Sequence, residues 1–190
     1  MPRIDPVTAP YSDALQQRFD RLVPPGMTPP AIFRTVARNE SLFLHLVDSG
    51  LLGRTGLLDR RVLSPRLREL LILRTCVAAG NDYEWHLHVD TISARMGLAE
   101  PQIADTRRPV PDPALWSAAE LAALALPDAL VRRLDVDDAL YARLAAHYDT
   151  AELIEMTQLI GLYAGVAMMV ALARPERDRY QALKQATKQA

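Results

Sequence analysis

The chain has 190 residues, of which 49% are hydrophobic and 24% are charged, a composition that excludes a largely disordered chain. Its 22 basic and 23 acidic side chains leave a net charge of -1, which excludes the strongly basic class typical of nucleic-acid-binding domains. We therefore expect no nucleic-acid partner. The length predicts a single domain over 1–190, with an N-terminal helix and proline-rich linker at 1–30 and a polar tail at 175–190.

The number of cysteines and the length of the apolar stretches exclude several further kinds of protein and of site. Cys76 is the one cysteine, so an intramolecular disulfide, a cysteine-rich zinc site and a Cys-x-x-Cys redox pair are excluded. The stretch 1–13 is polar and interrupted by prolines, which predicts no signal peptide and a cytoplasmic location. The most apolar stretch, Leu159–Ala173, is shorter than the roughly 18 residues of a membrane span. We interpret it as a buried helix and expect no membrane partner.

Apolar residues recur at helical spacing along most of the chain and no run alternates as a strand would, so the sequence predicts an all-α fold. In the N-terminal part we expect a helix over 12–22, a break at four prolines, and a second helix over 31–48. Gly50 and Gly53 are expected to end this second helix.

The middle of the chain predicts a helical hairpin. A Ser-Pro pair at 64–65 suits the cap and first position of a helix, and the apolar stretch over 67–79 stops at Gly80. An Asn-x-x-Glu pattern at 81–84 then predicts a helix that runs to Met96.

The remainder predicts four more helices, one of which opens with a Ser-x-x-Glu capping box. They are expected over 102–108, from 117 onward, over 137–147 and over 150–173.

Three side chains of the hairpin could carry chemistry. His88 shares the apolar stripe of its helix with Trp85, and Glu84 lies one turn before His88, within reach of a hydrogen bond. On the preceding helix Glu69 shares an apolar stripe with Cys76, where a buried carboxylate needs a partner. If the helices pack antiparallel, Glu69, Glu84 and His88 converge in one apolar pocket. Burial and neighbouring charge would then shift the pKa values of these side chains towards those needed for general acid–base catalysis.

Each of these residues also has a structural interpretation. Glu84 could only cap its helix, His88 could be a hydrogen-bonded core histidine, and Glu69 could pair with Arg74. Cys76 is interpreted as a small buried hydrophobe rather than a nucleophile. A metal site built from the two glutamates and the histidine lacks a recognised ligand signature, so we expect no metal and no cofactor.

Two motifs of the hairpin carry a family resemblance. They are Leu-Ser-Pro-Arg-Leu-Arg-Glu-Leu-Leu-Ile-Leu at 63–73 and Asn-Asp-Tyr-Glu-Trp-His-Leu-His at 81–88. They resemble the carboxymuconolactone decarboxylase family, whose other branch is the alkylhydroperoxidase D proteins, over roughly 32–103. The apolar stretch 155–173 is similar to the family's closing helix. The resemblance implies a bundle of about six or more helices, assembled as dimers, trimers or hexamers.

The resemblance also separates the two branches. In the peroxidase branch the functional residues are a glutamate, a Cys-x-x-Cys pair and a histidine four residues after the second cysteine. Glu69 and His88 match the glutamate and the histidine, but Asn81 and Glu84 stand at the cysteine positions. We therefore expect the branch without redox cysteines and no peroxidase activity by the family mechanism.

The function predicted on this basis is a cofactor-free enzyme that decarboxylates or isomerises a small lactone or organic acid. His88 would be the proton donor or shuttle, Glu84 would tune His88, and Glu69 would orient His88 or act as a second acid or base. An anionic substrate needs a cation, for which Arg34, Arg38 and Arg74 are the candidates.

Two alternatives remain open at this point. One is a peroxiredoxin-type antioxidant protein that acts through Cys76, and the other is a noncatalytic small-molecule-binding module. In either case we expect a homo-oligomer, because Ala164, Gly165 and Ala167 permit close helix approach.

Overall fold

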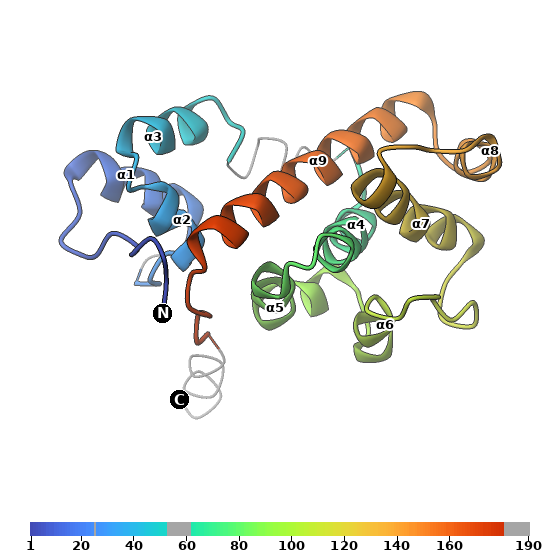
Figure 1. Ribbon diagram of the computed structural model, residues 1–190, viewed down its shortest axis with the longest axis horizontal. Coiled ribbons are helices and arrows are strands. Elements are labelled where there is room, and N and C mark those ends of the chain that lie inside the picture. Colours follow the sequence, from blue (N-terminus) through green and yellow to red (C-terminus); the bar gives the residue numbers. More distant parts are fainter. Residues whose placement is uncertain (25, 53–61, 181–190) are drawn as a thin grey trace. The chain divides into compact units, whose positions relative to one another are not determined.

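The computed structural model describes residues 1–24, 26–52 and 62–180, and this part of the chain is helical (Figure 1). It contains nine α-helices and one 3₁₀ helix, with no strand among the described residues. The predicted all-α fold of six or more helices is therefore confirmed.

The chain separates into two compact units. The first comprises residues 1–60 and 168–179, and the second comprises 61–167 and 180–190. The division lies inside one long helix, because α9 (Thr150–Ala173) contributes to both. The single domain over 1–190 stays a prediction, and most of its polar tail lies outside the described residues.

The first unit is built from three short helices, α1 (Asp13–Leu22), α2 (Ala31–Val36) and α3 (Glu40–Asp48). Their apolar faces meet around Phe19 and Phe43, whose ring centroids lie 5.0 Å apart in a fully buried cluster.

The single helix predicted over 31–48 is wrong. The chain leaves the helix after Val36, and Asn39 caps a new one by accepting a hydrogen bond from the backbone N–H of Leu42 at 3.1 Å. An asparagine side chain competes with the backbone for hydrogen bonds and so favours a cap over a helix interior. Gly50 has φ of 77°, as the expected helix stop requires, whereas Gly53 lies outside the described residues.

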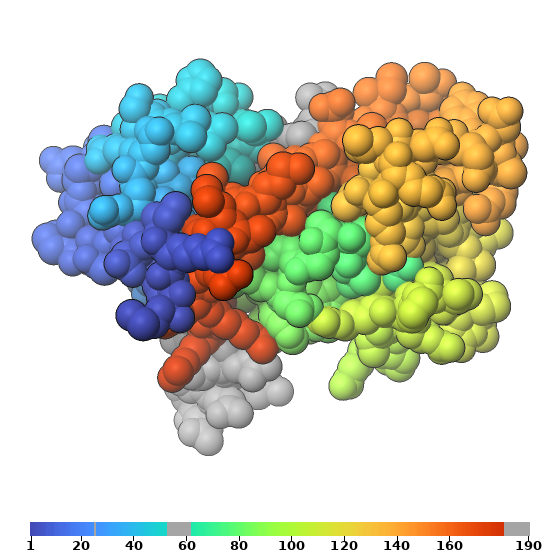
Figure 2. Space-filling view, viewed as in Figure 1, coloured from blue at the N-terminus to red at the C-terminus, as the bar shows by residue number. Residues whose placement is uncertain are grey.

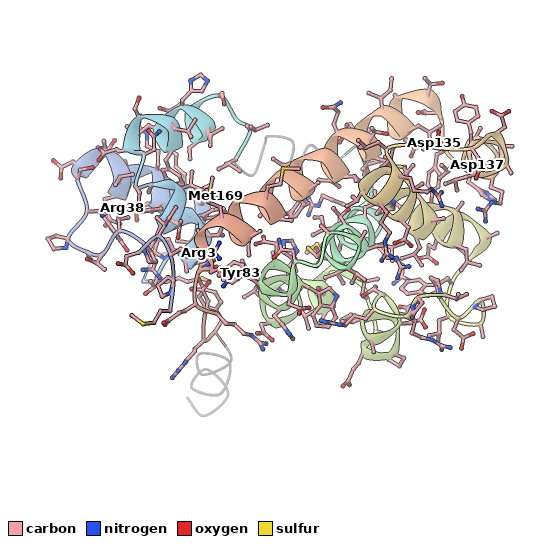
Figure 3. All side chains as sticks on the ribbon, in the orientation of Figure 1. Arg3, Arg38, Tyr83, Asp135, Asp137 and Met169 are labelled. Carbon is pink, nitrogen blue, oxygen red and sulfur yellow. The ribbon has the colours of Figure 1, made fainter. Side chains whose placement is uncertain are left out.

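The second unit carries the hairpin and the C-terminal helices. Besides the second-unit part of α9, its elements are α4 (Pro65–Ala78), α5 (Asp82–Thr91), the 3₁₀ helix η1 (Ser93–Met96), α6 (Glu100–Asp105), α7 (Ala118–Arg133) and α8 (Asp138–Ala145). The most buried of them is α4, which packs against both α5 and α7. Asp137, labelled in Figure 3, caps α8 by accepting from the backbone N–H of Leu140 at 2.8 Å.

The second hairpin helix is shorter than predicted. Its α-helical part ends at Thr91, and Ile92 has a φ of −127° outside the helical range. The chain then forms η1 and stops at Gly97, whose φ of 85° is favourable only for glycine. Met96 therefore does not continue the α-helical stripe of His88.

The interpretation of α9 as a buried helix is wrong. It has 24 residues, and it contains an 18-residue window of mean hydropathy 1.7 that meets the length and composition test for a membrane span, although only 33% of that window is buried. One face, with Met156, Leu159 and Tyr163, is buried, whereas Ile154 and Met168 on the other are exposed. Figure 2 shows α9, in orange to red, at the surface along this view. The sequence did not show that α9 has one buried and one exposed face, because apolar residues occur on both faces.

Candidate active site

The centre of the second unit holds a buried carboxylate–imidazole pair. Glu69 of α4 faces His88 of α5, and Nδ1 of His88 lies 3.1 Å and 3.0 Å from the two carboxylate oxygens. Both residues are buried, with 1% of Glu69 and 5% of His88 exposed. Since burial removes the screening of water, the attraction between them is far stronger than that of a surface pair.

The hairpin places these two side chains together for local reasons. Ser64 caps α4 at the residue before Pro65, and α4 ends just before Gly80, whose φ of 66° reverses the chain. Asn81 caps α5 immediately afterwards. Tyr83, labelled in Figure 3, marks the start of this helix. A turn this short forces α4 and α5 antiparallel, so the first half of one meets the second half of the other.

Two further side chains complete a hydrogen-bonded chain. Ser93 of η1 donates its hydroxyl proton to Oε1 of Glu69 at 2.6 Å. On the other side of the imidazole, the hydroxyl oxygen of Tyr163 of α9 lies 3.2 Å from Nε2 of His88. Tyr163, Ser93 and His88 are all buried. The path Ser93–Glu69–His88–Tyr163 therefore crosses the core as one network.

Sequence reasoning assigned no role to Ser93 or Tyr163. Tyr163 is 75 residues from His88, so no helical spacing relates them. Ser93 faces Glu69 only because α5 ends at Thr91. The available signal for Tyr163 was a phenol on the apolar helix α9, since a buried tyrosine hydroxyl usually has a hydrogen-bond partner.

The charges around His88 favour its protonated form. Burial alone lowers the pKa of an imidazole, but the charge and hydrogen bond of Glu69, with a smaller contribution from Glu84, raise the pKa of His88 to about 10. Burial disfavours ionisation of Glu69, yet His88 and the Ser93 hydroxyl together hold its pKa below the ordinary value. At neutral pH the pair is therefore an imidazolium and a carboxylate. Both ring nitrogens of His88 then donate, Nδ1 to Glu69 and Nε2 towards Tyr163.

Glu84 joins the site, so the structure brings the three predicted residues together. Its Oε1 lies 3.6 Å from Nε2 of His88. The interpretation of Glu84 as only a capping residue does not fit, because the backbone N–H of Asn81 donates to the carbonyl of Cys76 at 2.8 Å instead. Only half of the capping box forms, in which Oδ1 of Asn81 accepts from the N–H of Glu84 at 3.2 Å.

Cys76 is a buried thiol close to these carboxylates. Burial and the negative charges of Glu84 and Glu69 raise its pKa well above the ordinary value. The thiolate is the nucleophilic form, so this environment opposes the reactivity of Cys76.

One of the predicted cations, Arg74, is held by partners outside this site. Arg74 is buried and donates from Nε to Asp128 at 2.9 Å and from Nη1 to the carbonyls of Thr106 and Arg108 at 2.7 Å each. It therefore binds neither Glu69 nor an external anion.

The other two arginines belong to the first unit. Arg34 donates to the carbonyls of Pro29 and Val7. Arg38, labelled in Figure 3, lines a surface hollow of about 280 Å³ beside Tyr11 and Ser12.

Metal ligation has no support in the described ranges 1–24, 26–52 and 62–180. No group of three His, Cys, Asp or Glu side chains there is arranged to hold a metal ion. His86, two residues from His88, packs its ring edge-on to Trp85 instead, with centroids 5.0 Å apart.

The hairpin lies within a segment that matches a known protein family. The model of the carboxymuconolactone decarboxylase family matches residues 52–129, which include Glu69, Glu84 and His88. Residues 52–129 belong to the carboxymuconolactone decarboxylase family. The resemblance read from the hairpin motifs is confirmed, whereas Tyr163 lies beyond the matched segment.

Two solved structures share the fold of this chain. They are the debrominase Bmp8 without ligand, with a TM-score of 0.77, and its cysteine-to-alanine variant in complex with 2,3,4-tribromopyrrole, with a TM-score of 0.76. Each is 17% identical and covers 97% of this chain and 96% of its own. At this identity the likeness shows the fold alone. A search of curated proteins gave no match.

Proposed function

We propose that the protein is a cofactor-free enzyme that transfers protons to or from carbon in a small lactone or organic acid, as in decarboxylation or isomerisation. The observation that carries this proposal is the buried chain from Glu69 through His88 to Tyr163. In this chain a carboxylate holds one ring nitrogen of His88 while a phenol, itself able to donate a proton, meets the other. Such an arrangement suits a proton relay.

The relay works as follows. His88 is an imidazolium whose Nε2–H donates to the hydroxyl oxygen of Tyr163. The phenolic proton of Tyr163 is then directed away from His88 and can pass to a carbanionic carbon of the substrate. As the phenol loses this proton, its oxygen takes the proton of Nε2, so His88 becomes neutral and the negative charge of Glu69 remains beside it. Glu69 keeps the imidazole ring oriented throughout.

Decarboxylation and isomerisation differ only in how the carbanion forms. In decarboxylation the C–CO₂⁻ bond breaks, its electron pair enters the conjugated carbonyl, and the relay protonates the carbon. In isomerisation the Glu84 carboxylate takes a C–H proton from one carbon, and Tyr163 delivers its proton to another. Neither needs a redox group, in line with the absence of a Cys-x-x-Cys pair in the sequence.

The experiment is deuterium incorporation and CO₂ release in D₂O, followed by NMR over a panel of lactones, lactams and dicarboxylic acids. We expect one class to react with the wild type and to lose at least about a hundredfold in rate with His88→Gln or Tyr163→Phe. His86→Gln is the matched control, because His86 lies on the same helix outside the relay. Unchanged rates in both relay variants, with the fold verified by circular dichroism, contradict the proposal.

A thiol-based antioxidant activity through Cys76 is the other candidate, although burial and the charges of Glu84 and Glu69 outweigh a backbone hydrogen bond and disfavour the thiolate. Cys76→Ser tests it directly, since peroxide turnover that disappears in this variant supports the thiol mechanism over the proton relay.

A further inference from the structure

Two buried polar atoms at the start of α5 have no hydrogen-bond partner among residues 1–24, 26–52 and 62–180. They are Nδ2 of Asn81, a donor, and Oε2 of Glu84, an acceptor. Only 4% of Asn81 and 6% of Glu84 is exposed. A buried polar group without a partner destabilises the folded state, so two at the start of one helix need an explanation.

The other hydrogen bond of the Asn81 side chain shows that its unpartnered atom is a donor. Oδ1 of Asn81 accepts from the backbone N–H of Glu84 at 3.2 Å, so the other end of the amide is the NH₂ group. Both residues belong to the first turn of α5, where Asn81 is the cap and Glu84 the third helical residue.

The same carboxylate connects this turn to the proton relay. Oε1 of Glu84 lies 3.6 Å from Nε2 of His88, which lies 3.2 Å from the hydroxyl oxygen of Tyr163. A group held by Oε2 of Glu84 therefore lies beside the atoms that would deliver a proton.

We propose that Asn81 and Glu84 bind the substrate, Asn81 by donating to its carbonyl oxygen and Glu84 by accepting from an adjacent N–H or O–H group. The inference rests on the proposed function and narrows its substrate to a small neutral ring with a carbonyl beside a donor. A lactam, a hydroxylactone and a cyclic enol have this pattern.

The charges of the site support a neutral substrate. Glu69 and Glu84 bring two negative charges, and His88 and Arg68 bring two positive charges, so no positive charge is in excess, while Arg74 is held by Asp128. A carboxylate placed against Oε2 of Glu84 would meet like charge, which is costly in a buried site. The substrate pattern therefore favours isomerisation over decarboxylation.

With an enol substrate, every proton that leaves one group is taken up by another. Glu84 takes the enol O–H proton, the C–O bond becomes a carbonyl, and the C=C electron pair takes the phenolic proton of Tyr163 to form a C–H bond. Tyr163 recovers its proton from Nε2 of His88, and His88 recovers one from the Glu84 carboxyl group. No oxidant or co-reactant is consumed.

Binding at Asn81 can be measured directly because the sequence has two asparagines, Asn39 and Asn81. With asparagine side-chain amides labelled with ¹⁵N, the protein gives two NH₂ signal pairs, and Asn81→Asp identifies one by its loss. Asn39 caps α3 in the first unit in the same way and is the internal control. Aspartate is an equally good cap, so Asn81→Asp keeps the helix start while it removes the donor.

The probes are 2-pyrrolidinone, which has a carbonyl beside an N–H, N-methyl-2-pyrrolidinone, which lacks the donor, and succinate. We expect 2-pyrrolidinone to shift the Asn81 signals and not those of Asn39. N-methylation should weaken binding by about tenfold, the effect of one lost hydrogen bond. Equal binding of the N-methyl compound, stronger binding of succinate, or Asn81 signals unmoved by 2-pyrrolidinone overturns the inference.

The assay detects binding and not proton transfer, so the two proposals fail separately. If His88→Gln abolishes deuterium incorporation while the Asn81 signals stay unmoved, the relay stands and this inference is wrong. If the Asn81 signals respond as expected but no compound exchanges protons, the binding pair stands and the relay is wrong.

Discussion

Replacing Glu69 by glutamine should convert His88 from an imidazolium into a neutral imidazole at neutral pH. Glutamine keeps the shape and can still accept from Ser93, but it removes the negative charge that faces Nδ1 of His88. That charge is the largest of the causes that raise the pKa of His88, and burial acts in the opposite direction. In Glu69→Gln the burial effect prevails, and we expect His88 to titrate at or below 6.5.

The expected loss in the free energy of unfolding follows from the raised pKa of His88. A rise from 6.5 to about 10 corresponds to roughly 5 kcal/mol in favour of the protonated form, at about 1.4 kcal/mol per pKa unit. Loss of one partner of a buried ion pair costs about 3–5 kcal/mol by mutation. We therefore expect Glu69→Gln to lower the free energy of unfolding by about 3–5 kcal/mol at pH 6.

The pH dependence has a definite sign. Because the pKa of His88 is raised on folding, its stabilisation is complete below pH 6.5 and is lost as the pH rises to about 10. The pKa of Glu69 is lowered, so its stabilisation is present above pH 4.5 and is lost as the pH falls through its folded-state value. The difference in unfolding free energy between wild type and Glu69→Gln should therefore be largest near pH 4.5–6.5 and shrink towards pH 10.

Two measurements check this prediction. NMR of the imidazole of His88 between pH 5 and 11 gives its pKa in each protein, and urea unfolding gives the stability at each pH. Glu40→Gln is the control, because Glu40 is an exposed glutamate that accepts from Ser12, and its replacement should cost less than about 1 kcal/mol. If His88 titrates near 6.5 in the wild type, or equally in wild type and Glu69→Gln, the reasoning is refuted.

Three further replacements probe other parts of the second unit. Tyr163→Phe should cost only about 1 kcal/mol of stability, because it removes one hydrogen bond to His88, and should lower turnover about a hundredfold; a stability loss with full turnover would remove Tyr163 from the relay. Arg74→Lys should lower the free energy of unfolding in urea by about 2–4 kcal/mol, because an ammonium cannot reproduce the forked hydrogen bonds to Asp128 and two carbonyls. A loss of less than about 1 kcal/mol would contradict this prediction. Gly165→Leu should leave the fold intact, since a Cβ at this position meets no atom within 4 Å, but it should dissociate the predicted homo-oligomer. Light scattering measures the mass of the assembly, and a monomeric wild type would contradict the prediction of a homo-oligomer.

Local signals predicted the hairpin well. Ser64, Asn81 and the box at 117–120 cap helices as expected, because a cap depends on side chains within one turn. The same kind of signal failed where a helix had to be interrupted, at Asn39 and after Thr91. There the apolar periodicity continues across the break, so the pattern alone could not show it.

The helical class, the hairpin and the choice of Glu69, Glu84 and His88 as candidate site residues could be predicted from the sequence, because they follow from periodicity, caps and turns within short segments. Only the tertiary structure decided that His88 meets Tyr163, that Arg74 is held by Asp128, and that α9 has an exposed face. These contacts join residues tens of positions apart in the chain. Their formation depends on how whole helices pack, which no short segment of the sequence encodes.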